Sequence, residues 1–188
     1  MKIILSANTD WFLYNFRLPL AYALRERSAD VVFVSPKGEF VQHLVAEGFR
    51  WLELPMTRDG MNPFQELGTV WQIYKLYKRE KPDLVHHFTV KNVLYGSLAA
   101  RFAGIEFTIN TIPGLGYVFT GEGPLKSILR VIVHNWYRLV LRGSYVTFDN
   151  ADDREYFLEK HLVRSDNSCL VRGAGVDTEY FTPLPEPD

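Results

Sequence analysis

The stretch "DLVHHFTVKNVLYGSLAARFAGIEFTINTI", Asp83 to Ile112, decides the fold. It opens with a β-rich run, continues over residues 90–103 with a helical period, and closes with a second β-rich run at residues 107–112. A strand, a helix and another strand in this order form the unit from which parallel sheets are built. The stretch therefore predicts an α/β domain.

The same alternation extends through the rest of the chain. We expect strands at residues 2–7, 30–35, 49–55, 83–88, 107–112, 144–149 and 168–172. We expect helices at about residues 15–27, 38–47, 63–80, 90–103, 124–142 and 151–161. This order predicts a doubly wound, Rossmann-like parallel sheet of about seven strands, in which ligands bind beyond the carboxyl ends of the strands.

Composition limits the class of protein. The chain has 188 residues, 47% apolar and 23% charged, as expected for one globular domain with a substantial core. A net charge of -1 gives no overall attraction to nucleic acid, and the single cysteine, Cys169, favours a reducing compartment. The first apolar run is too short for a signal peptide, and charges interrupt every window before the roughly 18 apolar residues of a membrane span. We expect a cytoplasmic protein that contacts a membrane without crossing it.

Several nucleotide and catalytic motifs are absent from the sequence. The loop expected after the first strand, "NTDWFLYNFR" at residues 8–17, contains no glycine, whereas a dinucleotide-binding loop needs G-x-G-x-x-G at this place. The chain also has no phosphate-binding P-loop, no G-x-S-x-G elbow and no metal-type spacing of Cys and His. We therefore expect neither a nicotinamide or flavin cofactor nor a bound metal.

The loops at the carboxyl ends of the strands supply the candidate binding residues. In the first loop, four aromatic side chains surround Asn15 and Arg17. Sugar rings stack on aromatic faces and Arg binds phosphate with two donors, although the same aromatics also suit a cap over the sheet. Thr89 and Lys91 stand at a helix start, where they can bind phosphate or simply cap the helix.

Two further features concern the fourth and fifth strands. His86 and His87 are adjacent on a strand, so they point to opposite faces, and a histidine in this setting is more often structural than catalytic. The loop "TIPGLGYVFTGEG", residues 111–123, has four glycines, which allow close approach to a ligand or movement as a lid.

The helix at 124–142 combines an apolar arc with a basic one. Its expected core face consists of Leu125, Ile128, Leu129, Ile132, Val133, Trp136, Leu139 and Val140. Its expected membrane-facing residues are Lys126, Arg130, His134, Arg138 and Arg142. No acidic residue occurs between Glu122 and Asp149, and repeated like charges weaken a helix, so we expect an anionic partner nearby. Acidic phospholipid and a bound diphosphate both fit, and ordinary solvated packing is the alternative.

Several segments together resemble a known enzyme family. They are "NTDWFLYNFR", "HHFTVKNVLYGSLAARFAGI", "TIPGLGYVF", "FDNADDREYF" and "VRGAGVDTEYFTP". Together they resemble the N-terminal domain of family 4 glycosyltransferases with the GT-B fold, in which two Rossmann-like domains face a cleft. The branch most similar to the chain extends polyprenyl-diphosphate-linked sugars for capsule, O-antigen or N-glycan assembly.

The resemblance implies roles for individual residues. It assigns acceptor binding to Asn15, Arg17, Thr89, Lys91, Thr111, Gly114, Leu115, Gly116 and Tyr117, and a hinge to Gly175 and Asp177. Many members have a histidine in the fifth-strand loop, whereas this chain reads Thr111-Ile112-Pro113-Gly114, so no catalytic residue is assigned. Close relatives often have Lys-Pro-Asn where this chain has Lys91-Asn92-Val93.

The resemblance also implies a domain plan and a reaction. Residues 1–178 correspond to the acceptor-binding domain and residues 179–188 to the start of a linker. The donor-binding domain, which binds the nucleotide-sugar substrate, is absent from this chain. We expect the parent to be a retaining hexosyl- or N-acetylhexosaminyltransferase on the inner face of the plasma membrane. The chain alone is expected to be inactive, because the cations that stabilise the departing diphosphate are missing.

Two other readings remain open. A GT-B-shaped nucleotide-sugar epimerase works in solution and needs no basic membrane face. A free-standing α/β binding module needs no partner domain, and the proline-rich ending "YFTPLPEPD" speaks against it.

Overall fold

The computed structural model describes residues 1–54, 56, 63–114 and 123–175, and for residues 63–65 and 124–129 it describes the backbone only. The strands of this part are β1 (Lys2–Ser6), β2 (Asp30–Ser35), β3 (Arg50–Glu53), β4 (Leu84–Phe88), β5 (Phe107–Ile112), β6 (Tyr145–Phe148) and β7 (Ser168–Leu170). The helices are α1 (Asp10–Glu26), α2 (Val41–Ala46), α3 (Pro63–Glu80), α4 (Ser97–Ala103), α5 (Pro124–Val140) and α6 (Ala151–Glu159), with a π-helical turn η1 (Asn92–Gly96) and a 3-10 turn η3 (Ser165–Asn167).

The strands form one parallel sheet in the order β3-β2-β1-β4-β5-β6-β7. All the expected strands and helices are present, so the doubly wound α/β fold is confirmed. The expected linker lies outside the described residues, and the domain limits remain a prediction.

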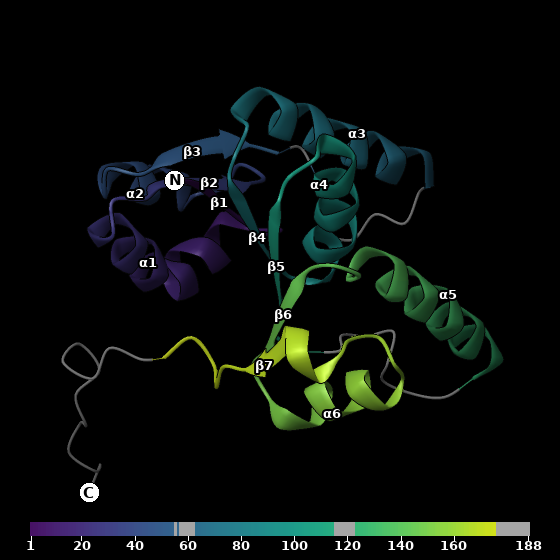
Figure 1. The fold of residues 1–188 in the computed structure, drawn as a ribbon. Helices are drawn as coiled ribbons and strands as arrows, with labels where there is room; N and C mark the ends of the chain where they lie inside the picture. The colour runs from purple at the N-terminus through teal and green to yellow at the C-terminus, as the bar shows by residue number, and fades with distance from the viewer. Residues whose placement is uncertain (55, 57–62, 115–122, 176–188) are drawn as a thin grey trace, which may run out of the picture.

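Helices cover the two faces of the sheet (Figure 1). α1 and α2 lie on one face, and α3, α4 and α5 lie on the other. Right-handed crossovers explain this division, because the chain steps from β1 toward β3 along one side and then returns past β1 to β4. The loops after β1 and β4 consequently leave the sheet toward opposite faces. This switch in direction is where ligands of such sheets bind.

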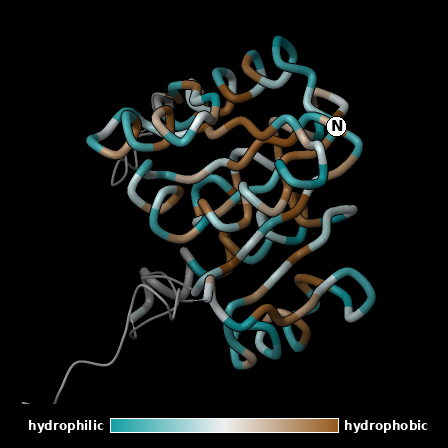
Figure 2. The backbone as a smooth tube through the Cα atoms, turned by 90° about the vertical axis from the view of Figure 1, so that its left-hand side faces the viewer, coloured by the Kyte–Doolittle hydropathy of each residue, from teal (hydrophilic) through white to brown (hydrophobic). Residues whose placement is uncertain are grey.

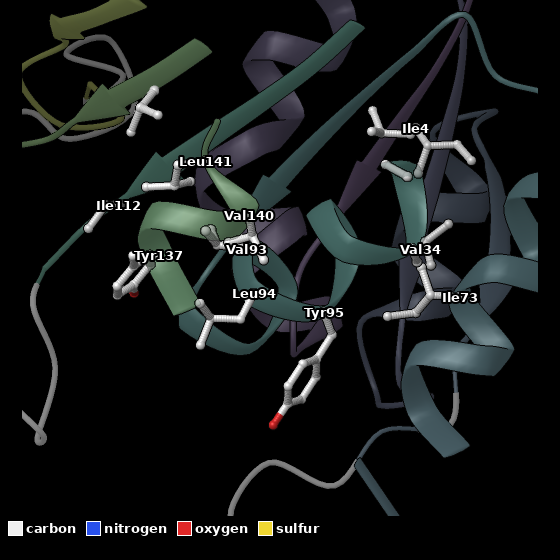
Figure 3. Close-up of a cluster of buried hydrophobic side chains, with 14 of the residues drawn as sticks. Ile4, Val34, Ile73, Val93, Leu94, Tyr95, Ile112, Tyr137, Val140 and Leu141 are labelled. Atoms are coloured by element: carbon white, nitrogen blue, oxygen red, sulfur yellow. The ribbon is translucent and has the colours of Figure 1, made fainter. Parts of the chain in front are cut away.

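The core lies between the sheet and its helices. The hydrophobic strands run through the middle of the molecule, while hydrophilic residues gather on the outer helices (Figure 2). On the α3–α5 side, Ile4 and Val34 from the sheet belong to the same buried cluster as Ile73, Val93 and Tyr137 (Figure 3). A strand that is buried on both faces has a nearly continuous apolar sequence, and the sequences of β1 and β2 are of this kind.

The first helix begins earlier than expected. Residues 8–17 were expected to form a loop, but α1 starts at Asp10. Thr9 is its N-cap, because the Thr9 hydroxyl accepts a hydrogen bond from the Phe12 backbone N–H at 3.2 Å. Asn15 and Arg17 therefore lie on a helix, where their directions are set by a rigid backbone.

The expected orientation of α5 is wrong in part. Ile132 and Leu139, expected in the core, are 53% and 54% exposed. The buried residues of the described part of this helix and its end are Val133, Tyr137, Val140 and Leu141. The reason is the position of α6. The Phe157 ring of α6 packs edge-on against the Tyr137 ring, with centroids 5.1 Å apart, so the Tyr137 side of α5 is buried.

Candidate functional site

A hollow of about 450 Å³ lies beside the N-terminal half of α1, at the ends of β6 and β7. It is lined by Phe12, Phe16, Arg17, Asp149, Arg172, Gly173, Ala174 and Gly175. Two cations, one carboxylate and two aromatic rings thus share one concave surface. Gly173 and Gly175 adopt positive φ values of 68° and 77°, and a Cβ atom at either position would meet no atom within 4 Å. A ligand can therefore approach the backbone of this segment closely.

Arg17 is the buried cation of this hollow. It is only 8% exposed, and its guanidinium lies over the rings of Phe12 and Phe88, 5.1 and 4.5 Å from their centroids. Its Nη2 atom is 3.9 Å from the Asp149 carboxylate, at the outer limit of an ion pair. Its Nε atom is buried without a hydrogen-bond partner. The Arg17 guanidinium therefore has one N–H donor without a partner within the described protein.

Asp149 and Arg17 affect each other's ionisation. Burial raises the pKa of Asp149 above its ordinary value, and the charge of Arg17 opposes this rise. Burial also lowers the pKa of Arg17, which Asp149 partly counteracts. Each charge is therefore incompletely compensated by the other. A phosphate entering the hollow can replace Asp149 as the partner of Arg17.

A row of polar side chains continues from this hollow across the sheet. The Phe88 ring contacts the guanidinium of Arg17 and also the His86 ring, whose centroid is 4.1 Å away. His86 Nε2 is hydrogen-bonded to the Thr111 hydroxyl at 2.7 Å, which in turn bonds the Thr147 hydroxyl at 2.7 Å. The row connects three neighbouring strands below Arg17. The expected residue Thr111 is thus linked to Arg17 through His86 and the Phe88 ring.

His87 points to the other face, as expected, and is structural. Its Nδ1 donates to Asn110 Oδ1 at 2.9 Å, and its Nε2 accepts from the Tyr77 hydroxyl at 2.8 Å. The tautomer follows from Asn110 Oδ1, which can only accept and also accepts from the Ser97 hydroxyl. Both ring nitrogens are used within the core. His87 therefore has no free nitrogen for catalysis.

Both histidines make the protein sensitive to acid. Burial lowers the pKa of His86 to about 3 and that of His87 to about 4. In the unfolded chain they take up protons near pH 6.5, so stability is full above that pH and falls as the pH drops, by about 1.4 kcal/mol per pH unit for each histidine. We expect urea unfolding at pH 5 to give a free energy about 4 kcal/mol below that at pH 7. Equal values at the two pH values would contradict this assignment.

Thr89 and Lys91 lie in a strained segment after β4. Thr89 has a φ of 72°, which is unusual for a β-branched residue, and its hydroxyl is buried without a hydrogen-bond partner. The expected helix at 90–103 contains the π-helical turn η1, a feature often found at functional sites. Lys91 pairs with Glu66 at 2.8 Å, so the ion pair ties this segment to α3. Lys91 is thus engaged within the fold.

Most of the other expected acceptor and hinge residues do not line the hollow or lie outside the described residues. Asn15 is on α1 but not in the lining of the hollow, and its side chain donates to the Trp11 carbonyl at 2.9 Å. Gly114 follows β5, and Gly175, expected as a hinge, lines the hollow. Leu115, Gly116, Tyr117 and Asp177 lie outside the described residues. The structure therefore brings together Arg17 and Gly175, with Thr111 in the adjoining row.

Sequence reasoning missed Asp149 and Arg172. Asp149 lies 132 positions after Arg17, so no local pattern connects the two. Its position after a strand could have indicated it, because Asp149 directly follows β6 and ligands of such sheets bind beyond the carboxyl ends of the strands. Arg172 lies two residues after the end of β7. Both are the last residues of expected strands, so a search for polar residues at the strand ends would have found them.

The residues expected to face a membrane differ in exposure wherever the structure describes their side chains. Arg130 is half-buried, and His134 is hydrogen-bonded to the Tyr156 hydroxyl of α6 at 2.9 Å. Burial, followed by the charge of Arg138, lowers the pKa of His134. Arg138 and Arg142 are exposed, and the side chain of Lys126 lies outside the described residues. The membrane role of these five residues stays a prediction, and the contact with Tyr156 places the His134 side chain against α6.

No helix among the described residues is both long enough and apolar enough to span a bilayer. No group of three or more His, Cys, Asp or Glu side chains among them is arranged to hold a metal ion.

Comparison with known proteins gives the family. Residues 2–150 match the family model described as glycosyl transferase 4-like, which covers more than half of the chain. The chain therefore belongs to the glycosyl transferase 4-like family.

Two relatives have named activities. The chain is 24% identical over 185 residues to the N,N'-diacetylbacillosaminyl-diphospho-undecaprenol α-1,3-N-acetylgalactosaminyltransferase of Campylobacter jejuni, a match that covers 98% of this chain and 49% of that protein. It is 28% identical over 121 residues to the UDP-Gal:α-D-GlcNAc-diphosphoundecaprenol α-1,3-galactosyltransferase of Escherichia coli, covering 63% of this chain and 30% of that protein. The chain thus spans about half the length of the first relative.

Solved structures share the fold. A glycosyltransferase from Rickettsia africae superimposes with a TM-score of 0.71 at 18% identity, covering 95% of this chain and 44% of that chain. The UDP-GlcNAc 2-epimerase from Neisseria meningitidis gives a TM-score of 0.65 at 14% identity, covering 93% of this chain and 47% of that chain. Transferases and epimerases both have this fold, so the fold alone does not choose between them.

Proposed function

We propose that this chain is the acceptor-binding part of a glycosyltransferase that moves a sugar from a nucleotide sugar to a saccharide linked to a polyprenyl diphosphate. Family membership supports sugar transfer, and the names of both relatives specify diphosphoundecaprenol-linked acceptors. The observation that carries the proposal is the hollow around Arg17, since it combines a buried cation, a second arginine and two aromatic rings.

The chemistry of the hollow suits a sugar diphosphate. Arg17 and Arg172 exceed the single carboxylate Asp149 by one positive charge. A diphosphate is bound best by several N–H donors that lie in one plane, and a guanidinium group supplies such donors. Phe12 and Phe16 offer ring faces to the attached sugar. The hydrogen bonds from His86 through Thr111 to Thr147 tie together β4, β5 and β6.

The remaining parts of the reaction belong to the longer enzyme. The C. jejuni relative is about twice as long as the matched chain, so we place the nucleotide-sugar site and the cations for its leaving diphosphate in a second domain. A lipid-linked acceptor would place the enzyme at an anionic membrane surface. The nucleotide sugar serves as a substrate, and the proposal needs no resident cofactor.

A nucleotide-sugar epimerase is the second candidate, because the N. meningitidis epimerase has the same fold. The family match and both named relatives favour transfer. The two functions differ in ligand, since an epimerase binds only the nucleotide sugar.

Calorimetric titration of the chain separates the two functions. The ligands are a short-prenyl diphosphate-linked N-acetylhexosamine, the same glycoside on the prenyl alcohol without phosphates, and UDP-GlcNAc. We expect the diphosphate-linked sugar to bind and the phosphate-free glycoside to bind at least about tenfold more weakly. Tighter binding of UDP-GlcNAc than of the diphosphate-linked sugar would support the epimerase instead.

A further inference from the structure

An apolar surface on the opposite side of the sheet from α1 has no role in the site just described. A shallow hollow of about 410 Å³ lies between α3 and α4, lined by Leu67, Val70, Trp71, Tyr74 and Phe102. Leu67, Trp71 and Phe102 are 66%, 56% and 69% exposed. Large apolar side chains that are grouped and exposed in this way mark a contact surface.

The aromatic residues of this surface are held in place. The rings of Trp71 and Tyr74 are stacked, with centroids 5.1 Å apart and planes inclined by 20°. Lys75 Nζ lies 5.4 Å from the centre of the Trp71 ring. The indole is therefore presented on a rigid helix with an ammonium group beside it, and Trp favours the boundary between lipid and water.

The charge along α3 favours an anionic partner. Leu67, Trp71, Lys75 and Lys78 follow one another at spacings of four, four and three residues, so they share one face of the helix. Carboxylates on α3 are already paired, because Glu66 binds Lys91 and Glu80 binds both Lys2 and Arg50. Among the described side chains of α3, this face thus has apolar groups at one end and unopposed cations at the other.

We propose that the α3–α4 surface, defined as Leu67, Val70, Trp71, Tyr74 and Phe102 with Lys75 and Lys78, rests on an anionic lipid bilayer. The inference rests on the proposed function, because a lipid-linked acceptor is presented at a membrane. The apolar side chains enter the headgroup boundary, and the two lysines reach the phosphates with their stems along the apolar surface. This surface takes the membrane role that the sequence assigned to the basic residues of α5.

Vesicle co-sedimentation tests the surface. The chain is mixed with phosphatidylcholine vesicles, or with vesicles that also contain phosphatidylglycerol, at low and high salt. The variants are Trp71→Ser, the double variant Lys75→Glu with Lys78→Glu, and the matched control Trp11→Ser. Trp11 is 49% exposed but lies on α1, on the other face of the sheet.

We expect phosphatidylglycerol vesicles to bind the chain. Trp71→Ser should weaken that binding about tenfold, Trp11→Ser should leave it unchanged, and the double lysine variant should weaken it more than tenfold at low salt. Equal losses for both tryptophan variants would overturn the inference. So would a loss with Arg138→Glu and Arg142→Glu but not with Trp71→Ser, or dimerisation through Trp71 without vesicle binding.

The acceptor titration distinguishes failure of this inference from failure of the proposed function. A short-prenyl acceptor is dissolved in water, so Trp71→Ser should bind it as the unchanged chain does. If vesicles fail to bind but the acceptor still binds, only the membrane surface is wrong.

Discussion

Replacing Arg17 by Gln is expected to weaken binding of the diphosphate-linked sugar by about 10- to 100-fold, because hydrogen bonds to a charged group contribute about 1.5–3 kcal/mol. Arg17 is the buried cation of the hollow, and its Nε atom has no partner within the protein. Arg17→Lys should lose nearly as much, since an ammonium group cannot reproduce the planar fork. Titration calorimetry measures both losses.

Arg25→Gln is the matched control. Arg25 lies on the same helix and also stacks on two rings, those of Tyr22 and Phe49, at 4.9 and 4.5 Å. It lies outside the lining of the hollow, so its replacement should leave the affinity unchanged. The double variant Arg17→Gln with Asp149→Asn avoids an unpaired, half-buried carboxylate, and it should remain folded while failing to bind. If the Arg17 and Arg25 variants bound the diphosphate-linked sugar with equal affinity, Arg17 would not be part of the binding site.

Gly96→Ala and Gly68→Ala are expected to change stability in opposite directions. A Cβ atom at Gly96 would lie 2.5 Å from two atoms of the His87 ring, which cannot move because Tyr77 and Asn110 hold both its nitrogens. Such overpacking should cost about 3 kcal/mol. Gly68 lies within α3 with no atom within 4 Å of an added Cβ, so alanine there should stabilise by about 0.5–1 kcal/mol.

Thermal unfolding measures the pair of glycine variants. For a chain of this length, the Gly96 variant should melt about 10 °C lower and the Gly68 variant slightly higher than the unchanged chain. An unchanged melting temperature for Gly96→Ala would mean that His87 is free to move. That result would also weaken the assignment of His87 to a fixed buried network.

The fold could be predicted from the sequence because each strand and helix has a local pattern. The β-rich runs around His86 and Asn110, for example, mark β4 and β5 within one or two residues. The start of α1 was missed because aromatic residues beside Asn15 were interpreted as a binding loop, although Thr9 is a good N-cap. Periodicity was not enough for α5, whose buried side depends on the position of α6.

The site was only partly predictable for a similar reason. Arg17 and Gly175 lie in segments with a family pattern and both line the hollow, whereas Thr111 does not line it. Asp149 and Arg172 were not found, because tertiary folding alone brings them to Arg17. The pairing of Lys91 with Glu66 also joins residues 25 positions apart, and no local signal predicts it. Local patterns therefore specify the elements, while charge compensation depends on the packed sheet.

The most direct test of the central claim, that Arg17 binds the diphosphate of the acceptor, is nuclear magnetic resonance of the arginine side-chain Nε–H groups. The chain is observed while the short-prenyl diphosphate-linked sugar is added. We predict that the Arg17 Nε–H resonance shifts as its unpaired donor acquires a partner, while that of Arg25 stays in place. A bound ligand that leaves the Arg17 resonance unchanged would contradict the account.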